Sequence, residues 1–189
     1  QDLYWSSVAV GEDLMATKAA KLEVSESALC GDQLSLKLML QEGGRSAVYR
    51  KSFVIGQELI GAVQTFSAEG LPLPIQDRKN TEARLKMTGS EQWPEDARIA
   101  SARLKFDITH SYQGDLTVHL SAPDGSSFAV YKGEGGGDNV HFDKDLSSLL
   151  KGMSGGGVWS LHVKDGAVQD EGTLDAVSLE LTPVRYVCQ

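Results

Sequence analysis

The stretch ASARLKFDITHSYQGDLTVHLSAPDG, residues 100–125, decides the fold class. Its apolar residues alternate with polar ones over residues 100–108 and again over residues 116–122. Alternation with a period of two is typical of a β-strand that has one buried face and one solvated face. The turn at 123–125 ends the second strand, because Pro presets φ and Gly accepts a left-handed backbone. The stretch therefore predicts two strands of an antiparallel sheet.

Further alternating runs extend this pattern through the second half of the chain. VWSLHV (158–163) and AVSLEL (176–181) are two more half-buried strands, and Trp159 is predicted to belong to the core. Many of the 20 glycines cluster in short segments, and no long helical period occurs. We therefore expect an all-β chain whose second part, residues 63–189, is an antiparallel β-jelly-roll.

The first part of the chain predicts a smaller β unit. LSLKLML (34–40) places a leucine at every second position, and AVYRKSFVI (47–55) follows after a glycine-containing turn. Two such runs around a turn predict a hairpin. We expect residues 1–62 to form a small Ig-like β-sandwich, and residues 57–90 to be an extended connector that enters the jelly roll.

Composition and charge limit the partners. The 189 residues carry a formal net charge of −8. Nucleic acids and anionic membranes attract concentrated Lys and Arg, so neither is an expected partner. No apolar run approaches the roughly 20 residues that span a bilayer. The chain begins at Gln1 without an initiator Met or a signal peptide, and we expect it to be a piece of a longer, processed protein.

Cys30 and Cys188 are far apart in the sequence and form no CxxC metal motif. Two interpretations stay open: two buried free thiols, or one long-range disulfide in an oxidising compartment. We favour the disulfide, because Cys188 lies next to the C-terminus, where a covalent link prevents fraying. In the chain-entropy model, closing so long a loop contributes about 5 kcal/mol.

One short segment brings Ser111, His110 and His119 close in sequence, as a hydrolase site would. Closeness in sequence does not make them converge, because neighbours on a strand point to opposite faces. Ser111 also lacks the GxSxG turn of a nucleophile elbow, and His119 lies among hydroxyls on a polar face. We therefore expect no catalytic residue here. Gly114 is expected to take a left-handed φ, and Asp115 to hold the corner by accepting backbone N–H bonds.

Two loops collect acidic side chains that suit calcium. The candidate ligands are Asp138, Asp143, Asp145, Asp165 and Asp170. Calcium binds six to eight oxygens, drawn from carboxylates and backbone carbonyls, and the glycine-rich loop GEGGGDN exposes carbonyls. The alternative is that these residues cap surface turns, where Asp and Asn are common. A structural calcium ion is the one cofactor that the sequence suggests.

An ordered series of motifs runs through residues 65–184. They are Thr109–His110, Tyr112, Gly114–Asp115–Leu116, Pro123–Gly125, Gly137–Asn139, Gly157–Trp159, Asp165 and Gly172–Leu174. This series resembles the P domain (P/Homo B domain) of the proprotein convertases and of many secreted bacterial proteases. The structural motif residues carried over from that family are His110, Gly114, Asp115, Trp159 and Gly172.

The resemblance implies a β-jelly-roll appended to a protease catalytic domain, with no active-site residues of its own. In this family the module stabilises the catalytic domain, aids maturation, and in some members affects substrate or calcium dependence. The expected parent is a secreted, extracellular endopeptidase of the subtilisin-like serine or the metallo class. The expected partners are its catalytic domain and an extracellular protein substrate. Neither an HExxH motif nor a subtilisin-type serine motif occurs in these 189 residues.

Two other functions stay open. One is a stand-alone extracellular module that binds a protein or a glycan, which an exposed aromatic platform on a sheet face would favour. The other is a hydrolase that uses Ser111 or His110, for which these side chains and a carboxylate must meet in one cleft.

Overall fold

The computed structural model describes residues 23–42, 44–88 and 93–188. The chain divides into two compact units, Gln1–Ile55 and Gly56–Gln189. This division falls a few residues before the predicted boundary between residues 62 and 63, because strand β3 (Gln57–Ile60) pairs with the last strand of the second unit. Within the described ranges, no helix has the length and apolar character needed to cross a membrane.

The described part of the first unit is the predicted hairpin. Strands β1 (Gln33–Glu42) and β2 (Arg45–Val54) pair antiparallel along their whole length. The Gly31 N–H donates to the Ile55 carbonyl, and the Ile55 N–H donates to the Asp32 carbonyl, which closes the base of the hairpin. Residues 1–22 lie outside the described residues, so the Ig-like sandwich over residues 1–62 stays a prediction.

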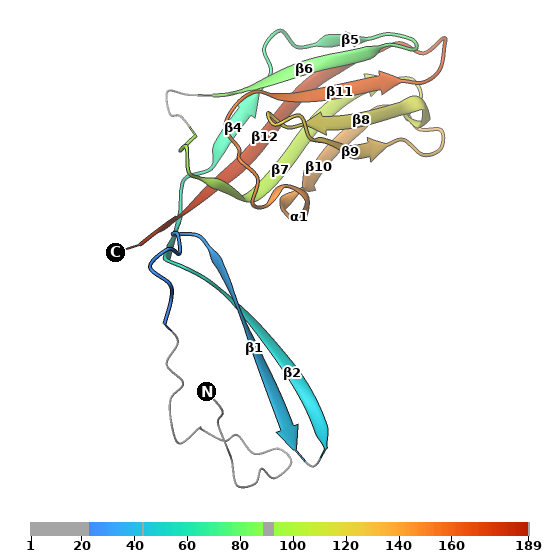
Figure 1. Cartoon of the computed structure of the whole chain (residues 1–189). Helices are drawn as coiled ribbons and strands as arrows, with labels where there is room; N and C mark the ends of the chain where they lie inside the picture. The colour runs from blue at the N-terminus through green and yellow to red at the C-terminus, as the bar shows by residue number, and fades with distance from the viewer. Residues whose placement is uncertain (1–22, 43, 89–92, 189) are drawn as a thin grey trace. The chain divides into compact units, whose positions relative to one another are not determined.

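The second unit is an all-β domain (Figure 1). Its strands after β3 are β4 (Gln64–Ser67), β5 (Leu73–Ile75), β6 (Asn80–Met87), β7 (Arg98–His110), β8 (Leu116–Ser121), β9 (Ser127–Lys132), β10 (Val140–Asp145), β11 (Trp159–Asp165) and β12 (Gly172–Val187). A short 3₁₀ helix, η1 (Gln113–Asp115), precedes β8, and α1 (Ser147–Leu150) follows β10.

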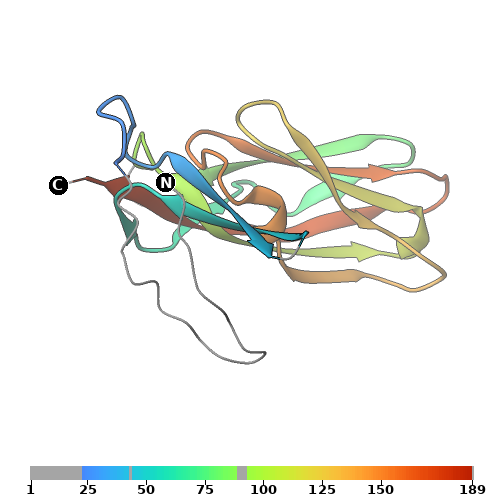
Figure 2. The same cartoon turned by 60° about the horizontal axis from the view of Figure 1, so that its bottom comes forward.

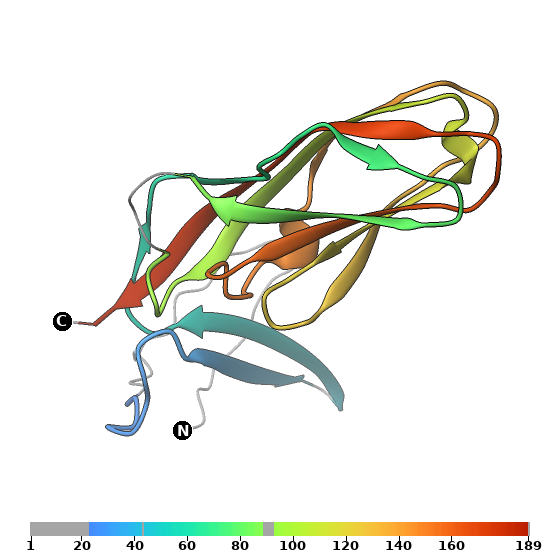
Figure 3. The same ribbon diagram turned by 90° about the horizontal axis from the view of Figure 1, so that it is seen from above.

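The strands form two facing layers of antiparallel pairs, as the turned views show (Figure 2 and Figure 3). In one layer β12 lies beside β7, and β10 pairs with the far edge of β7. In the other, β11 lies between β6 and β8, and β9 forms the edge. A short pairing of β4 with β6 joins the layers along one side. The prediction of an all-β sandwich of the jelly-roll kind is confirmed.

The alternation predicted from the sequence matches the observed burial along β7 and β8, except at the start of β7. Leu104 and Phe106 of β7 and Leu116 of β8 are at most 1% exposed. At the start of β7, however, Ile99 is fully buried and Ala100, predicted to point inward, is half-buried. The register against β12 shifts between Thr182 and Pro183 at this point, so a bulge changes which residues face inward.

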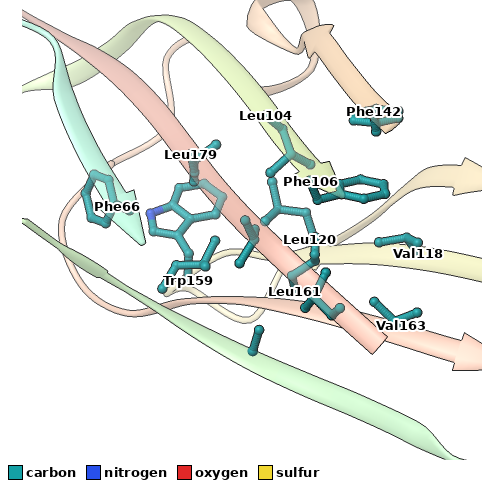
Figure 4. Packing of buried hydrophobic residues seen from close by; sticks show 14 of the residues in the cluster. Phe66, Leu104, Phe106, Val118, Leu120, Phe142, Trp159, Leu161, Val163 and Leu179 are labelled. Atoms are coloured by element: carbon teal, nitrogen blue, oxygen red, sulfur yellow. The ribbon is translucent and has the colours of Figure 1, made fainter. Parts of the chain in front are cut away.

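Trp159 lies at the centre of the core, as predicted, with no exposed surface. Its indole Nε1 donates to the Gly155 carbonyl at 3.0 Å, so the ring's polar group is satisfied inside the domain. Figure 4 shows side chains of both layers, Phe66 and Leu179 among them, converging on this region. Towards the β9 and β10 edges, Phe106 stacks on Phe142 with ring centroids 4.5 Å apart.

The segment predicted as a connector, residues 57–90, is built into the domain as β3 to β6. β6 pairs with β11 over six residue pairs and buries Ala83 and Leu85. The alternation in this strand is short and its apolar residues are few, so a strand here was only weakly indicated by the sequence. Pairing with β11 and β12, which are distant in sequence, decides the structure of this segment.

Because the core is close-packed, truncating Leu161 should be costly. Leu161 is fully buried, and Leu161→Ala is expected to lower the free energy of unfolding by about 2–5 kcal/mol, since a cavity forms beside Trp159. The exposed Lys164 on the same strand supplies the control, and Lys164→Ala should change stability by less than about 0.5 kcal/mol. Urea denaturation measures both, and similar losses for the two variants would contradict this description of the core.

Candidate functional site

Most of the predicted motif residues gather at one end of the second unit. We call this region the loop end and define it as residues 109–116, 133–139 and 165–172. Backbone hydrogen bonds tie its three segments together: the Gln113 N–H donates to the Gly137 carbonyl at 2.7 Å, and the Gly166 N–H donates to the Asp115 carbonyl at 2.9 Å. The loop end is thus one connected structure, although its segments are far apart in the sequence.

His110 lies at the centre of the loop end, and its side chain is fully buried. Its backbone N–H donates to the Asn139 side-chain oxygen at 3.0 Å, and its carbonyl accepts the Asn139 N–H at 2.9 Å. Gly172 pairs with His110 across the β7–β12 ladder. A Cβ at position 172 would come within 2.6 Å of the imidazole Cδ2 and would collide with the Thr109 carbonyl. Glycine is therefore required at 172 by contact with His110.

The imidazole of His110 faces the carboxylate of Asp165, which is also fully buried. Nε2 of His110 lies 3.5 Å from Oδ2 of Asp165, and neither atom has another hydrogen-bond partner among the described residues. The other carboxylate oxygen accepts the Ala167 N–H at 2.9 Å. The Tyr112 N–H donates to Nδ1 of His110 at 3.2 Å. Nδ1 of His110 also lies 3.0 Å from the Tyr112 carbonyl, so the tautomer of the ring decides whether Nδ1 donates to that carbonyl or accepts the Tyr112 N–H. The contact between His110 and Asp165 joins the end of β7 to the end of β11.

The glycine-rich loop packs its backbone directly on the turn that follows β7. A Cβ on Gly133 would collide with the Gln113 carbonyl, and one on Gly114 would collide with the Gly135 carbonyl. The prediction that Gly114 takes a left-handed φ is wrong, because Gly114 lies in η1 and is not among the positive-φ glycines. Position 114 needs a glycine because a side chain there would prevent the close approach of the Gly135 backbone. Asp115 accepts a backbone N–H at this corner, as predicted, and it does so through its backbone carbonyl, which binds the Gly166 N–H.

Ser111 and His110 do not share a partner. The Ser111 hydroxyl donates to Oδ1 of Asp170 at 2.7 Å on the surface, while the imidazole of His110 is turned inward to Asp165. His119 lies opposite His162 across the β8–β11 ladder, away from both. The structure therefore does not bring the serine, a histidine and a carboxylate of this segment into one hydrogen-bonded chain.

Four of the five predicted calcium ligands have separate partners. The partners of Asp165 and Asp170 are described above. Asp143 forms a bidentate pair with Arg103, with Nε–Oδ1 and Nη2–Oδ2 distances of 2.6 and 2.9 Å. Asp145 accepts the Ser147 N–H at 2.7 Å, and Asp138 is exposed in the glycine-rich loop. In the part of the chain that the structure describes, no three or more His, Cys, Asp or Glu side chains are grouped to hold a metal ion. A calcium site at these residues stays a prediction.

These partners shift the carboxyl pKa values. Hydrogen bonds from Arg103 hold the pKa of Asp143 below its ordinary value, and those from Ser147 do the same for the pKa of Asp145. Both carboxylates are therefore ionised at neutral pH. They stabilise the folded chain at neutral pH, and this contribution is lost as the pH falls through their lowered pKa values.

Two acidic residues outside the five predicted calcium ligands help to order the loop end. Asp77 accepts the Gln169 N–H at 2.8 Å and the Asp170 N–H at 3.3 Å from a segment far along the chain. Asp175 accepts the hydroxyls of Thr109 and Thr173. Burial raises the pKa of Asp175, but these hydrogen bonds outweigh burial and lower it overall. Nothing in the local sequence could identify the long-range partners of Asp77.

A double-mutant cycle tests the contact between His110 and Asp165. Because each side chain leaves the other buried and unsatisfied when it is removed, His110→Ala and Asp165→Ala should show a coupling energy of about 1–3 kcal/mol in urea denaturation. The neighbouring exposed pair is the control: Ser111→Ala with Asp170→Ala should couple by less than about 0.5 kcal/mol. Additive losses for the buried pair would show that the two groups do not interact.

Comparison with known proteins gives a match within the second unit. Residues 99–181 match the family model of the proprotein convertase P-domain, and this range contains the whole loop end. Leupeptin-inactivating enzyme 1 of Streptomyces exfoliatus is 38% identical over 78 residues, which are 41% of this chain and 17% of that protein. A calcium-dependent protease of Trichormus variabilis is 30% identical over 118 residues, which are 58% of this chain and 17% of that protein.

Among solved structures, a serine protease of Aeromonas sobria is similar, with a TM-score of 0.46 and 14% sequence identity. The similarity covers 71% of this chain and 28% of that one. The chain therefore spans a minor part of each protein that it resembles. The matched range contains the motif series and lies within the all-β second unit, so residues 99–181 are similar to the proprotein convertase P-domain in both sequence and fold class.

Proposed function

We propose that this chain is a non-catalytic accessory region of a secreted bacterial protease, and that its P domain stabilises the catalytic domain of the same polypeptide. The family match and the similarity to a protein named as a protease support this role. The observation that carries it is the use of the motif residues. His110, Asp165 and Gly172 make internal contacts, so the residues that mark the family build a scaffold.

A tethered scaffold can stabilise its neighbour without chemistry of its own. Linking two domains gives each a high effective concentration near the other, so even a modest interface is occupied. Any partner that binds only the folded catalytic domain shifts its folding equilibrium towards the native state. A close-packed P domain suits this role because it loses little conformational entropy on docking.

Binding of an extracellular protein substrate is a second proposal, favoured by a hollow on the outer face of β7, β10 and β12. This hollow has a volume of about 220 Å³ and is lined by Lys105, Asp107, His141 and Asp143 among others. Its charges are already paired: His141 contacts Asp107, and Lys105 contacts Glu180 at 2.6 Å. Such a mixed-charge surface offers hydrogen bonds to a polar chain. Phe106 also lines the hollow, but it is only 1% exposed and so does not form the exposed aromatic platform that a glycan-binding module would favour.

The accessory role is tested in the full-length parent protein. Deleting residues 56–189 should lower the temperature at which the protease loses half of its activity, while kcat/KM on a short peptide below that temperature stays unchanged. The Leu161→Ala variant, which only weakens the P domain, should shift inactivation in the same direction by a smaller amount. An unchanged inactivation temperature in the deletion would rule the stabilising role out. Hydrolysis of casein by the isolated chain, abolished by Ser111→Ala, would instead establish an active site.

We also propose that the loop end binds a structural calcium ion. The Trichormus variabilis relative is named as a calcium-dependent protease, which supports a role of calcium in that protein. If calcium binds, adding EDTA should lower the melting temperature of the chain, because an ion that binds the folded state alone stabilises it. Asp138→Asn should reduce that shift, since Asp138 is exposed in the glycine-rich loop. Equal melting temperatures in calcium and in EDTA would contradict the proposal. The pairing of Cys30 with Cys188 likewise stays a prediction.

A further inference from the structure

A hollow opens at the end of the second unit that lies opposite the loop end. The loop end lies where β7 ends and β12 begins, whereas this hollow is lined by residues just before β7 and near the end of β12. We call it the β12 hollow. It has a volume of about 320 Å³, and Leu59, Ile60, Pro183 and Arg185 are among its lining residues. Ligand pockets begin at about 300 Å³, so the β12 hollow has room for one or two residues of a peptide.

The β12 hollow exists because β12 continues past the layer that faces it. Figure 1 and Figure 3 show β12 running on towards the C-terminus beyond the ends of β6 and β11. Leu179 and Leu181 of β12 are fully buried in the core, and Pro183 and Arg185 follow at the same two-residue spacing. Pro183 also pairs with the fully buried Ile99. The core-facing side of β12 therefore extends into the hollow and forms part of its wall.

Close backbone contacts fix the shape of the β12 hollow. The Gly61 N–H donates to the Pro183 carbonyl at 2.9 Å, and a Cβ on Gly61 would lie 2.9 Å from Cγ of Pro183. On another side of the hollow, the Ala97 N–H donates to the Pro94 carbonyl at 3.0 Å, and Ala97 is fully buried. Because these lining segments are already held in place, a ligand that enters loses little free energy to ordering them.

The β12 hollow combines apolar walls with one cation. Arg185 is the one charged residue among the described residues that line it. Its side chain is exposed and forms no ion pair with a described acid. Leu59 lies directly opposite Arg185 in the β3–β12 ladder and is 37% exposed, and Ile60 is 66% exposed. A ligand that complements this lining carries an apolar group and a carboxylate close together.

We propose that the β12 hollow binds the C-terminal residue of a peptide, with an apolar side chain in the hollow and the terminal carboxylate on Arg185. A C-terminal residue carries both groups on one Cα, which matches a small hollow with a single arginine at its wall. An internal segment would need a second residue to supply the carboxylate and would have to leave the hollow in both directions. The planar guanidinium can bind both oxygens of a carboxylate, which makes this contact specific for the chain end.

Binding of acetyl-Gly-Gly-Leu with a free carboxylate to the 189-residue chain tests the proposal. Titration followed by NMR should give saturable shifts of the Ile60, Gly61 and Arg185 amides, while the amides of the loop end stay unchanged. The same peptide with an amidated C-terminus should bind at least about tenfold more weakly, because it lacks the charge that pairs with Arg185. Acetyl-Gly-Gly-Gly should also bind more weakly, because it has no apolar side chain. Absence of saturable shifts at millimolar peptide, or equal binding of the free and amidated forms, would overturn the proposal.

Two matched arginine substitutions separate the role of Arg185 from that of charge in general. Arg185→Met keeps a long side chain without the charge, and it should abolish the difference between the free and amidated peptides. Arg98→Met is the control and should preserve that difference, because Arg98 is exposed and pairs with Val184, whose side chain points to the other side of the sheet from that of Arg185. Equal effects of the two variants would refute the assignment to Arg185. Binding of acetyl-Leu-Asp-Gly-amide as tightly as the free peptide would show that the hollow accepts internal segments, and would refute recognition of the chain end.

Discussion

The contact between His110 and Asp165 is the interaction on which the loop end depends. Both side chains are fully buried, and each presents to the other an atom that has no further partner among the described residues. Leaving either atom alone in the interior would cost about 1–3 kcal/mol, so the ends of β7 and β11 must stay together. Gly172 then has to be a glycine, because the imidazole occupies the space that a side chain would need. One buried pair thus explains why three separated motifs occur together.

The close approach of two backbone segments explains the remaining motifs in the same way. Gly133 and Gly114 lie where a Cβ would collide with the carbonyls of Gln113 and Gly135. Without side chains between them, the loop and the turn can share backbone hydrogen bonds, as Gln113 and Gly137 do. The glycines of this loop therefore serve the close packing of the two backbone segments. A family signature of this type reports the requirements of a scaffold and says little about chemistry.

Prediction from the sequence worked where structure is local and weakened where it depends on distant partners. The period of two in β7, β8 and β11 identified the buried faces, because a strand's pleat decides them residue by residue. The bulge that turns Ile99 inward arises from the pairing with β12, and the incorporation of residues 57–90 arises from pairing with β11 and β12, so neither could be read locally. The same holds for the site. That His110 belongs to a motif was visible, but its partner Asp165, on another strand, and the support of Asp77 required the fold.

The distribution of charge over the outer face of β7, β10 and β12 bears on how such a scaffold acts. Arg103 pairs with Asp143 and Lys105 pairs with Glu180, and all four side chains are at least 32% exposed. Exposed ion pairs contribute little to stability, typically below about 1 kcal/mol. Their charges stay accessible to water and can exchange their present partners for groups on another protein at little cost. The interior therefore provides the rigidity of the domain, whereas the ion pairs of this outer face hold its polar groups in place and contribute little to its stability.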